Sequence, residues 1–323
     1  MKALAVFSGG LDSMLAVELI QAQGIDVLGL FFETPFFHAD KARRSAEMLH
    51  VPLKVLDLTE PHLAIVKKPR YGYGGNMNPC IDCHSLMIRE AAARLAEENA
   101  RFIITGEVLG QRPMSQNLRS LSTVAAQSGL PEYILRPLSA KLLPITLPEE
   151  KGWVRREKLL ALSGRSRKPQ MELARAYNFA EYPSPGGGCL LTDPVFSRRL
   201  KDLLSASPDC DIREIELLKL GRHFRLGPAT KIVVGRNKKE NEQILTLAEE
   251  SDLLIKVESI PGPLALAVGD ISRQTENIAL ALALSYSDAK NGEVAEVKLS
   301  VKGNERKESA PARSKSEFQA LMI

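Results

Sequence analysis

A glycine-rich hexapeptide near the start of the chain, Ser-Gly-Gly-Leu-Asp-Ser at residues 8–13, limits the fold more than any other feature. It follows an apolar run at residues 3–7, which is typical of a buried parallel strand. It precedes residues 14–23, where apolar side chains recur four apart, as on one face of a helix. The glycines are therefore expected in a turn between a strand and a helix N-terminus. Such a turn offers backbone N–H groups and the positive end of a helix dipole to an anion.

Strand-like and helix-like patterns alternate through the first half of the chain. After residues 3–7, apolar runs typical of strands lie at residues 25–32, 53–58 and 101–105. Helical patterns lie at residues 39–50, 85–98, 116–128, 153–162 and 171–177. This alternation predicts an α/β fold with a doubly wound parallel sheet. Ligands of such sheets bind outside the carboxyl ends of the strands, where residues 8–13 and 105–107 are both expected.

The side chains of the hexapeptide suit an anionic ligand. Gly9 and Gly10 let the backbone approach the anion closely, and the hydroxyls of Ser8 and Ser13 add hydrogen-bond donors. The loop has no lysine and is too short to be the GxxxxGK[ST] loop that holds a transferable γ-phosphate. The alternative interpretation is a glycine turn with a serine that caps the helix.

A second polar segment, residues 105–117, also follows a predicted strand. Glu107 in this segment is a candidate contact for a ribose or a metal ion. Its other candidates, for phosphate or base, are Gln111, Ser115 and Gln116. Phe31 and Phe32 end the strand at residues 25–32, where they could flank an adenine base or belong to the core.

Cysteine placement indicates chemistry rather than disulfides. Cys80 and Cys83 form a CxxC just before the helix predicted at residues 85–98, and a helix N-terminus favours the thiolate. A redox disulfide would need a thioredoxin-like context, and a structural zinc site would need a second ligand pair of similar spacing; neither is evident. Cys189 follows three glycines, whereas Cys210 lies between two aspartates that disfavour its thiolate. A sulfur-handling site is the interpretation that remains.

Composition and charge limit the expected cellular compartment and the kind of partner. The net charge of +4 is mild but permits a local basic face for an acidic partner. The apolar run at residues 3–7 is too short for a signal peptide or a membrane span, so we expect a cytoplasmic protein without membrane attachment. In a reducing compartment the cysteines are expected to bind metal or act as catalysts.

The second half of the chain predicts a smaller α+β domain. Its strand candidates are residues 223–226, 231–234, 253–257 and 264–268, with an edge strand at residues 294–301. Its helix candidates are residues 195–204, 212–220, 240–250 and 274–285. The expected divisions are a nucleotide domain at residues 1–165, a connecting segment with the third cysteine at 166–195, an RNA-binding domain at 196–303 and a polar, mobile tail at 304–323.

Three motifs together resemble the PP-loop tRNA thiolases, namely the 4-thiouridine synthases and the 2-thiouridylases. They are SGGLDS at residues 8–13 (the PP-loop), NPCIDCH at 78–84 and TGEVLGQRPMSQN at 105–117. The resemblance implies a HUP-type (adenine nucleotide alpha hydrolase-like) fold that binds ATP and Mg²⁺. It implies an enzyme that adenylates a uridine carbonyl oxygen in tRNA and replaces that oxygen with sulfur. The ATP-binding residues it implies are Ser8, Gly9, Gly10, Asp12, Ser13, Phe32, Gly106, Glu107 and Gln111.

The same resemblance assigns catalytic roles to Asp12, which would organise the pyrophosphate and Mg²⁺, and to Cys80, Cys83 and Cys189. Two sulfur mechanisms fit the cysteines. In one, a persulfide on one thiol attacks the activated uridine and a second thiol resolves the product. In the other, all three thiolates ligate a [4Fe–4S] cluster whose open iron binds sulfide. The sulfur donor would be a cysteine desulfurase, a persulfide carrier or sulfide.

Residues 221–227 and 234–241 resemble the RNA-binding domain of the NFACT proteins. The cations expected at RNA phosphates are Arg222, Arg225, Arg236, Lys238 and Lys239. Phe224 is a candidate stacking face for a base, and ordinary surface charge is the alternative. Residues 165–168 form another basic cluster, which would contact RNA phosphates or lie solvated at the surface.

Two other function classes remain open at this stage. One is an ATP pyrophosphatase that delivers ammonia or sulfur to a small metabolite. The other is a nucleotide-regulated RNA-binding protein without thiolation chemistry.

Overall fold

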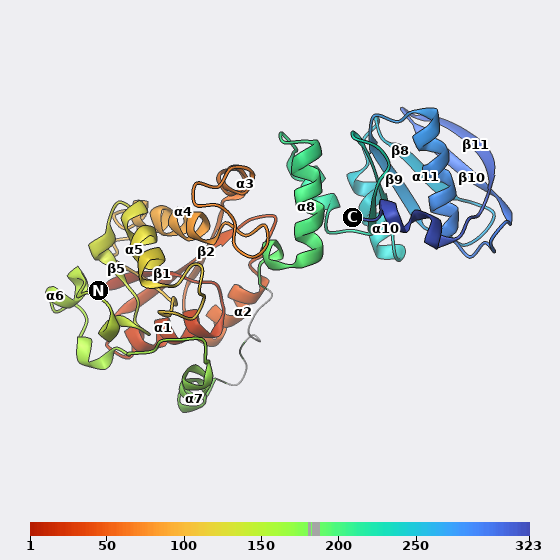
Figure 1. The fold of residues 1–323 in the computed structure, drawn as a ribbon. Helices are drawn as coiled ribbons and strands as arrows, with labels where there is room; N and C mark the ends of the chain where they lie inside the picture. The colour runs from red at the N-terminus through yellow and green to blue at the C-terminus, as the bar shows by residue number, and fades with distance from the viewer. Residues whose placement is uncertain (180–181, 183–187) are drawn as a thin grey trace. The chain divides into compact units, whose positions relative to one another are not determined.

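The computed structural model describes residues 1–179, 182 and 188–323, and part of the expected connecting segment, residues 180–181 and 183–187, lies outside them. The chain divides into two compact units, residues 1–193 and 194–323, and each unit has its own sheet (Figure 1).

The sheet of the first unit has five parallel strands in the order β3-β2-β1-β4-β5. The strands are β1 (Lys2–Val6), β2 (Asp26–Glu33), β3 (Leu53–Asp57), β4 (Phe102–Thr105) and β5 (Ile134–Leu135). The predicted parallel α/β fold is confirmed; β5 has two residues and is too short for a sequence pattern. The chain builds outward from β1 to β3 and then returns to the other side of β1. The carboxyl end of β1 is therefore the switch point where ligands of such sheets bind.

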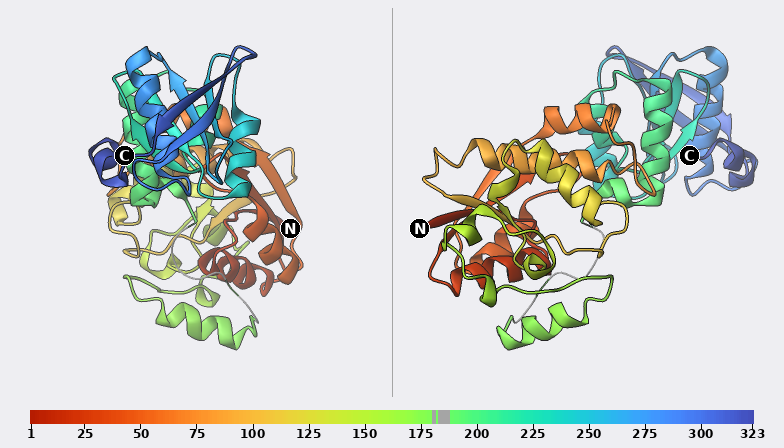
Figure 2. Two further views of the ribbon diagram at one scale, coloured as in Figure 1. Left: turned by 90° about the vertical axis from the view of Figure 1, so that its right-hand side faces the viewer. Right: turned by 60° about the vertical axis from the view of Figure 1, so that its left-hand side comes forward.

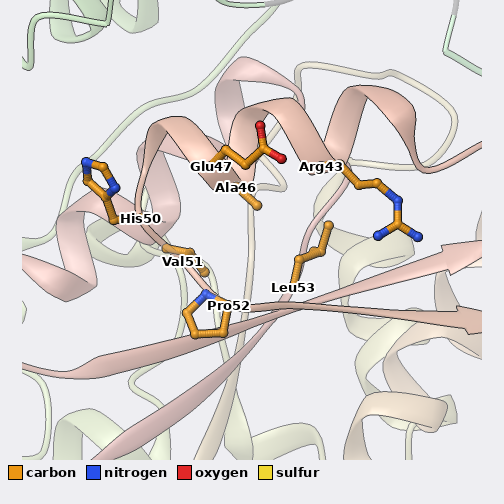
Figure 3. Close-up of a pocket in the computed structure, with 7 residues that line it drawn as sticks. All are labelled: Arg43, Ala46, Glu47, His50, Val51, Pro52 and Leu53. Carbon is orange, nitrogen blue, oxygen red and sulfur yellow. The ribbon is translucent and has the colours of Figure 1, made fainter.

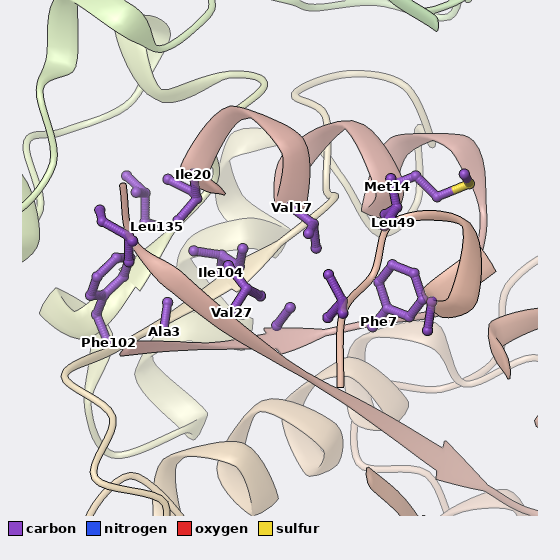
Figure 4. Close-up of a cluster of buried hydrophobic side chains, with 14 of the residues drawn as sticks. Ala3, Phe7, Met14, Val17, Ile20, Val27, Leu49, Phe102, Ile104 and Leu135 are labelled. Carbon is purple, nitrogen blue, oxygen red and sulfur yellow. The ribbon is translucent and has the colours of Figure 1, made fainter. Parts of the chain in front are cut away.

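Helices cover both faces of this sheet. They are α1 (Leu11–Gln21), α2 (Asp40–Met48), α3 (Thr59–Lys67), α4 (Cys80–Ala93), α5 (Leu118–Gln127), α6 (Leu147–Glu150) and α7 (Lys168–Ala176). Alternate residues of β1 serve opposite faces, because Ala3 packs with Val17 of α1 and Leu4 packs with Leu86 of α4. Figure 4 shows the core on the α1 face, and Figure 2 shows the helix layers from two further directions.

The helix predicted at residues 153–162 is wrong. The structure has only a 3₁₀ turn there, η3 (Arg156–Lys158). The following residues run extended beside residues 137–141, because Leu160 N donates to the Pro137 carbonyl at 3.0 Å and Leu162 N donates to the Leu138 carbonyl at 2.8 Å. Of the apolar side chains that suggested a helix, Val154 and Leu159 are buried, whereas Leu160 and Leu162 are half-buried.

The second unit contains a six-stranded antiparallel sheet in the order β11-β10-β8-β9-β7-β6. Its strands are β6 (Arg222–Arg225), β7 (Thr230–Val234), β8 (Leu253–Val257), β9 (Leu264–Gly269), β10 (Val294–Val301) and β11 (Asn304–Pro311). Its helices are α8 (Pro194–Ala206), α9 (Ile212–Leu217), α10 (Lys238–Leu247) and α11 (Arg273–Ser285). One apolar cluster joins α11 to the sheet, and another joins α9 and α10 to it. The α+β expectation therefore holds for this unit.

The end of the chain differs from the prediction of a mobile tail. Residues 304–311 form β11, which pairs along the whole of β10, so that β10 is an inner strand rather than the predicted edge. Ion pairs stabilise this polar strand, since Lys307 Nζ lies 2.7 Å from Glu296 and 3.0 Å from Glu258. A 3₁₀ segment, η5 (Lys315–Leu321), then buries Phe318. The sequence pattern did not predict this strand, because the strand has few apolar residues and its charged side chains are paired.

Across the part of the chain that the structure describes, no helix combines the length and the apolar character needed to cross a membrane.

Candidate functional site

The PP-loop joins β1 to α1 and rests closely on α2. Gly9 has a φ of +70°, and a Cβ at this position would lie 2.6 Å from the backbone of Ala42. The Ser45 hydroxyl donates to the Gly9 carbonyl at 2.8 Å. Helix α1 begins at Leu11 without a side-chain cap from Gly10. Its first N–H groups are thus available to an anion at the positive end of the helix dipole.

The two serines of the PP-loop have different surroundings. Ser13 is buried and donates to the Gly10 carbonyl at 2.8 Å, which closes the loop. Ser8 is exposed. Its oxygen accepts from Gly10 N at 3.3 Å, and its hydroxyl donates to Ser13 Oγ at 3.3 Å, a bond that a ligand would replace. Ser8 is therefore the hydroxyl placed to reach a ligand, whereas Ser13 shapes the loop.

Asp12 is the acidic group of this loop, and it lies in a polar network. Its Oδ2 accepts from Gln111 Nε2 at 2.8 Å and lies 3.9 Å from Arg167 Nη2. Gln111 Oε1 accepts in turn from Gln170 Nε2 at 3.0 Å. Asp12 Oδ1 is buried and has no hydrogen-bond partner among the described residues. A free carboxylate oxygen is the ligand that a hard cation such as Mg²⁺ requires, so Asp12 fits the metal expected here.

Glu107 belongs to a second network, one that leaves it no free oxygen for a nucleotide. His84 Nδ1 lies 2.7 Å from Oε1, and Arg136 Nε donates to Oε2 at 2.8 Å. Burial acts to raise the pKa of Glu107, but Arg136 and then His84 outweigh it and lower the pKa to about 2. Glu107 therefore stays ionised and contacts His84 and Arg136, and its contact with a ribose or a metal ion stays a prediction.

The ATP contact expected of Phe32 stays a prediction, and the structure places this side chain in the core. Phe32 is 2% exposed and packs in the core cluster on the α4 face. Gly106 is required for packing, because a Cβ there would lie 2.5 Å from Ser13 N in the PP-loop. Ser115 and Gln116 are also buried. Of the second segment, Gln111 is the predicted residue that reaches Asp12.

The CxxC occupies the first turn of α4, as its position before a helical pattern predicts. Cys80 is half-buried, and its sulfur accepts from Asn78 Nδ2 at 3.1 Å. Cys83 is buried, with His62 Nε2 3.0 Å from its sulfur. Burial raises the pKa of the Cys83 thiol well above its usual value and lowers the pKa of His62 to about 4. Cys80 is thus the accessible thiol of the pair.

Cys189 approaches the CxxC although it lies more than one hundred residues later in the chain. The Asn76 amide donates to the Thr192 carbonyl at 2.8 Å, and Leu190 N donates to the Phe36 carbonyl at 3.1 Å. Cys189 is half-buried, and desolvation, with a smaller effect from the nearby Cys80, raises the pKa of its thiol to about 11. The three predicted thiols are therefore neighbours, whereas Cys210 is buried in the second unit.

The thiols do not form a ready metal centre. Among the described residues, no three His, Cys, Asp or Glu side chains are grouped so that they could hold a metal ion. The [4Fe–4S] cluster at Cys80, Cys83 and Cys189 remains a prediction, and the described arrangement does not fit it.

A pocket of about 500 Å³ lies away from this site, at the amino end of β3 (Figure 3). Its lining comes from α2 and from residues 50–53, with Arg43, Glu47 and His50 around it. Residues of the PP-loop and the CxxC are not part of this lining. This pocket therefore does not serve the chemistry at the carboxyl ends of the strands.

Three residues that the sequence predictions missed belong to the site. Arg167 appeared only as part of a basic cluster, and Gln170 and Arg136 had no pattern to distinguish them. Each is brought to the site by the fold, from the start of α7 or from the residue after β5.

In the second unit, most of the predicted RNA-contacting cations are paired within the unit. Arg222 lies over the ring of Tyr286 at 4.8 Å, and Arg225 pairs with Asp202. Arg236 Nε donates to Glu240 Oε1 at 2.9 Å. The same Glu240 carboxylate accepts from the backbone N–H groups of Gly221 and Arg236, so it also fixes the two loops of the signature.

Lys238 and Lys239 lie at the start of α10, and both are exposed, as is Arg236. The Lys238 side chain is 91% exposed and lies 3.9 Å from Glu242. Phe224 is fully buried in the core of the unit, so the prediction that it stacks on a base is wrong.

Two family models match the chain. Residues 1–141 match the model described as thiamine biosynthesis protein (ThiI). Residues 221–320 match the model described as NFACT protein RNA binding domain.

Solved structures with similarity to the chain include a 4-thiouridine synthetase in complex with RNA and with bound ATP. It is 26% identical over 42% of this chain and 36% of its own length, with a TM-score of 0.36. The chain thus spans about a third of that protein. A predicted subunit of tRNA methyltransferase from Methanocaldococcus jannaschii is 16% identical over 54% of this chain and 74% of its own, with a TM-score of 0.36.

The C-terminal part of a fibronectin/fibrinogen-binding protein from Streptococcus suis is 13% identical over 75% of this chain and 100% of its own, with a TM-score of 0.28. The two family models match separate parts of the chain, one in each compact unit. The chain therefore joins a ThiI-type PP-loop domain to an RNA-binding domain of the NFACT type.

Proposed function

We propose that this chain is an ATP-dependent, AMP-forming tRNA sulfurtransferase, which adenylates O4 or O2 of a uridine and replaces that oxygen with sulfur. The proposal places the reaction in the cytoplasm, where thiols stay reduced. The ThiI match at residues 1–141 supports the reaction class, and the NFACT match at residues 221–320 supports an RNA substrate.

One observation carries the proposal: a buried contact joins the nucleotide loop to the cysteine helix. Gly106 packs on Ser13 of the PP-loop, and the next residue, Glu107, holds His84 at 2.7 Å. His84 directly follows Cys83 in α4. An activated uridine at the PP-loop would thus lie near a thiol, as a two-step replacement of oxygen by sulfur requires.

In the first step, the N–H groups at the start of α1 and the Ser8 hydroxyl would bind the phosphates of ATP. The uridine oxygen attacks the α-phosphorus, the bond to the β-phosphate oxygen breaks, and pyrophosphate leaves. Oriented N–H groups and a helix dipole stabilise charge that develops on the leaving group. Mg²⁺ at Asp12, when bound, would neutralise part of the same charge.

In the second step, the two half-buried thiols, Cys80 and Cys189, are the working pair. A persulfide carrier supplies sulfane sulfur to one of them. The terminal sulfur attacks the uridine carbon, and AMP leaves with the C–O bond electrons. The other thiolate then attacks the cysteine sulfur, which releases the thiocarbonyl and leaves a disulfide between Cys80 and Cys189. A dithiol reductant from outside the protein restores both thiols.

The test is mass spectrometry of nucleosides from total tRNA, in a deletion strain and its parent. We expect one thiolated nucleoside to disappear and to return with the wild-type chain but not with Cys80→Ser. Purified protein should release pyrophosphate from ATP faster when the tRNA is present. Turnover that is unchanged by RNA, with an unchanged thionucleoside profile, would replace this proposal with chemistry on a small metabolite.

A further inference from the structure

The start of α7 lies beside the PP-loop, although its sequence lies more than 150 residues away from it. Residues 162–164 bring it there. Leu109 and Ser163 form a parallel bridge, and Gly164 N donates to the Leu109 carbonyl at 2.8 Å. The polypeptide thus runs beside the segment that contains Gln111 before it enters α7. Backbone pairing, rather than chance surface proximity, sets the position of Arg167 and Gln170.

Three buried polar atoms at this place lack a hydrogen-bond partner among the described residues. They are Asp12 Oδ1, Arg167 Nε and Gln170 Oε1. Buried polar atoms are nearly always paired, by protein, water or ligand. Gln111 links Asp12 Oδ2 at 2.8 Å to Gln170 Nε2 at 3.0 Å, and Arg167 Nη2 lies 3.9 Å from the same Asp12 oxygen. The free atoms include acceptors and a cationic donor, which together suit an anion bound with its counter-cation.

We propose that Arg167 binds the β- and γ-phosphates of ATP, and hence the pyrophosphate leaving group, with Gln170 as a positioning residue that orients Asp12 through Gln111. The inference rests on the proposed function for its nucleotide. A guanidinium presents several N–H donors in a planar fork that matches phosphate oxygens. Its side chain is 19% exposed, so water screens the contact less than it would at an open surface.

An alternative role for Arg167 is contact with RNA, because the sequence predicts that residues 165–168 either contact RNA phosphates or lie solvated at the surface. Arg165 and Lys168 are exposed, as a surface cluster requires. Arg167 is instead turned to Asp12. This difference makes Arg165→Ala a matched control that removes an equal charge from the same segment.

The experiment measures competition against a bound fluorescent ATP analogue in buffer with Mg²⁺, with inorganic pyrophosphate and AMP as competitors. Arg167→Ala should weaken the affinity for pyrophosphate about 10- to 100-fold. Arg167→Lys should weaken it less, because lysine keeps the positive charge but lacks the planar guanidinium donors. The affinity for AMP should change less than about threefold, since AMP lacks the β- and γ-phosphates. Arg165→Ala should match wild type for both competitors.

Equal weakening of pyrophosphate and AMP by Arg167→Ala would mean a structural role and would overturn the inference. The inference would also be overturned if Arg167→Ala bound pyrophosphate as tightly as Arg165→Ala does. It would equally be overturned if Arg167→Ala lost affinity for tRNA while its affinity for pyrophosphate stayed at the wild-type value. Wild-type protein that binds neither ATP nor pyrophosphate would overturn the proposed function and this inference together. Nucleotide binding without any thiolated tRNA product would remove only the substrate assignment, and the pyrophosphate comparison would still decide the role of Arg167.

Discussion

The nucleotide end of the first unit and the signature loops of the second unit both carry recognisable motifs, but their side chains are used differently. At the PP-loop, buried polar atoms of Asp12, Arg167 and Gln170 have no hydrogen-bond partner among the residues that the structure describes. In the second unit, Arg225 and Arg236 are paired with Asp202 and Glu240. A motif can therefore mark a binding site in one case and an architectural contact in the other.

The physical distinction is whether the folded chain pairs the charged side chains of the motif. In the second unit it pairs the signature arginines, although His223 Nδ1 of the same signature is buried without a hydrogen-bond partner among the described residues. Glu240 of the second unit accepts from Gly221 N at 3.2 Å and from Arg236 N at 2.9 Å, so it serves the loops around it. Asn241 likewise accepts from Leu264 N at 3.2 Å. Residues such as Glu240 and Asn241 would belong to a sequence signature because they stabilise the fold, not because they contact RNA. RNA contacts are then expected from exposed charges such as Lys239 and Lys238, whose contact with Glu242 at 3.9 Å is only a weak surface ion pair.

Cysteine substitutions in the first unit should have the largest effect on activity. Cys80→Ser and Cys189→Ser should each abolish thiolation, because each removes one sulfur of the working pair, while pyrophosphate release continues. The measurement is thionucleoside content beside pyrophosphate release on the same tRNA. Cys210→Ala, in the second unit, is the matched control and should thiolate as wild type does. Full thiolation by Cys189→Ser would contradict the two-thiol scheme.

Asp12→Asn should lower pyrophosphate release by about 100- to 1,000-fold, because the amide keeps the shape but loses the charge that holds the cation. Stability should be little changed, since the amide still accepts from Gln111 Nε2. Thermal unfolding and initial rates on the same preparation separate the two effects. Activity within threefold of wild type would remove Asp12 from the catalytic machinery.

Much of the fold could be predicted from sequence, because parallel strands and the helices between them leave apolar patterns. The PP-loop and the CxxC were placed correctly at a strand end and a helix start. The polar strand β11 was missed, because it is held by backbone pairing along β10, with surface ion pairs such as Lys307 with Glu296, and its sequence lacks apolar alternation.

Side-chain roles were harder to predict than positions. Glu107 was expected at a nucleotide, but its partner Arg136 comes from the residue after β5, a strand too short to recognise. Phe32 and Phe224 follow strand patterns in which either face could be buried, and both proved to be core. Which group pairs with which depends on segments far apart in the chain.

Removing the charge of Glu107 should destabilise the first unit. Glu107→Gln leaves the buried Arg136 without its counter-ion, a loss of about 3–5 kcal/mol in free energy of unfolding. The pKa of Glu107 is lowered from 4.5 to about 2, so its ionisation stabilises the fold above about pH 4.5. That contribution, about 3 kcal/mol, is lost as the pH falls from about 4.5 towards 2.

Denaturant unfolding at a series of pH values tests this. The difference in unfolding free energy between wild type and Glu107→Gln should shrink as the pH falls through that window. A difference that stays constant from pH 6 to pH 3 would show that the carboxylate is not held ionised by its neighbours.

The smallest effect is expected at two exposed lysines of the second unit, Lys238 and Lys239. Lys238→Ala and Lys239→Ala should each weaken tRNA binding by a few fold, without a change in stability, because neither side chain is buried. Each lost phosphate contact should reduce the slope of log K against log salt by about 0.7 to 0.9. Lys290→Ala, also at an exposed position, is the control and should leave the slope unchanged. If the signature arginines bind RNA instead, Arg225→Ala would lower the slope and Lys238→Ala would not, and the pairing of Arg225 with Asp202 would then have to open when RNA binds.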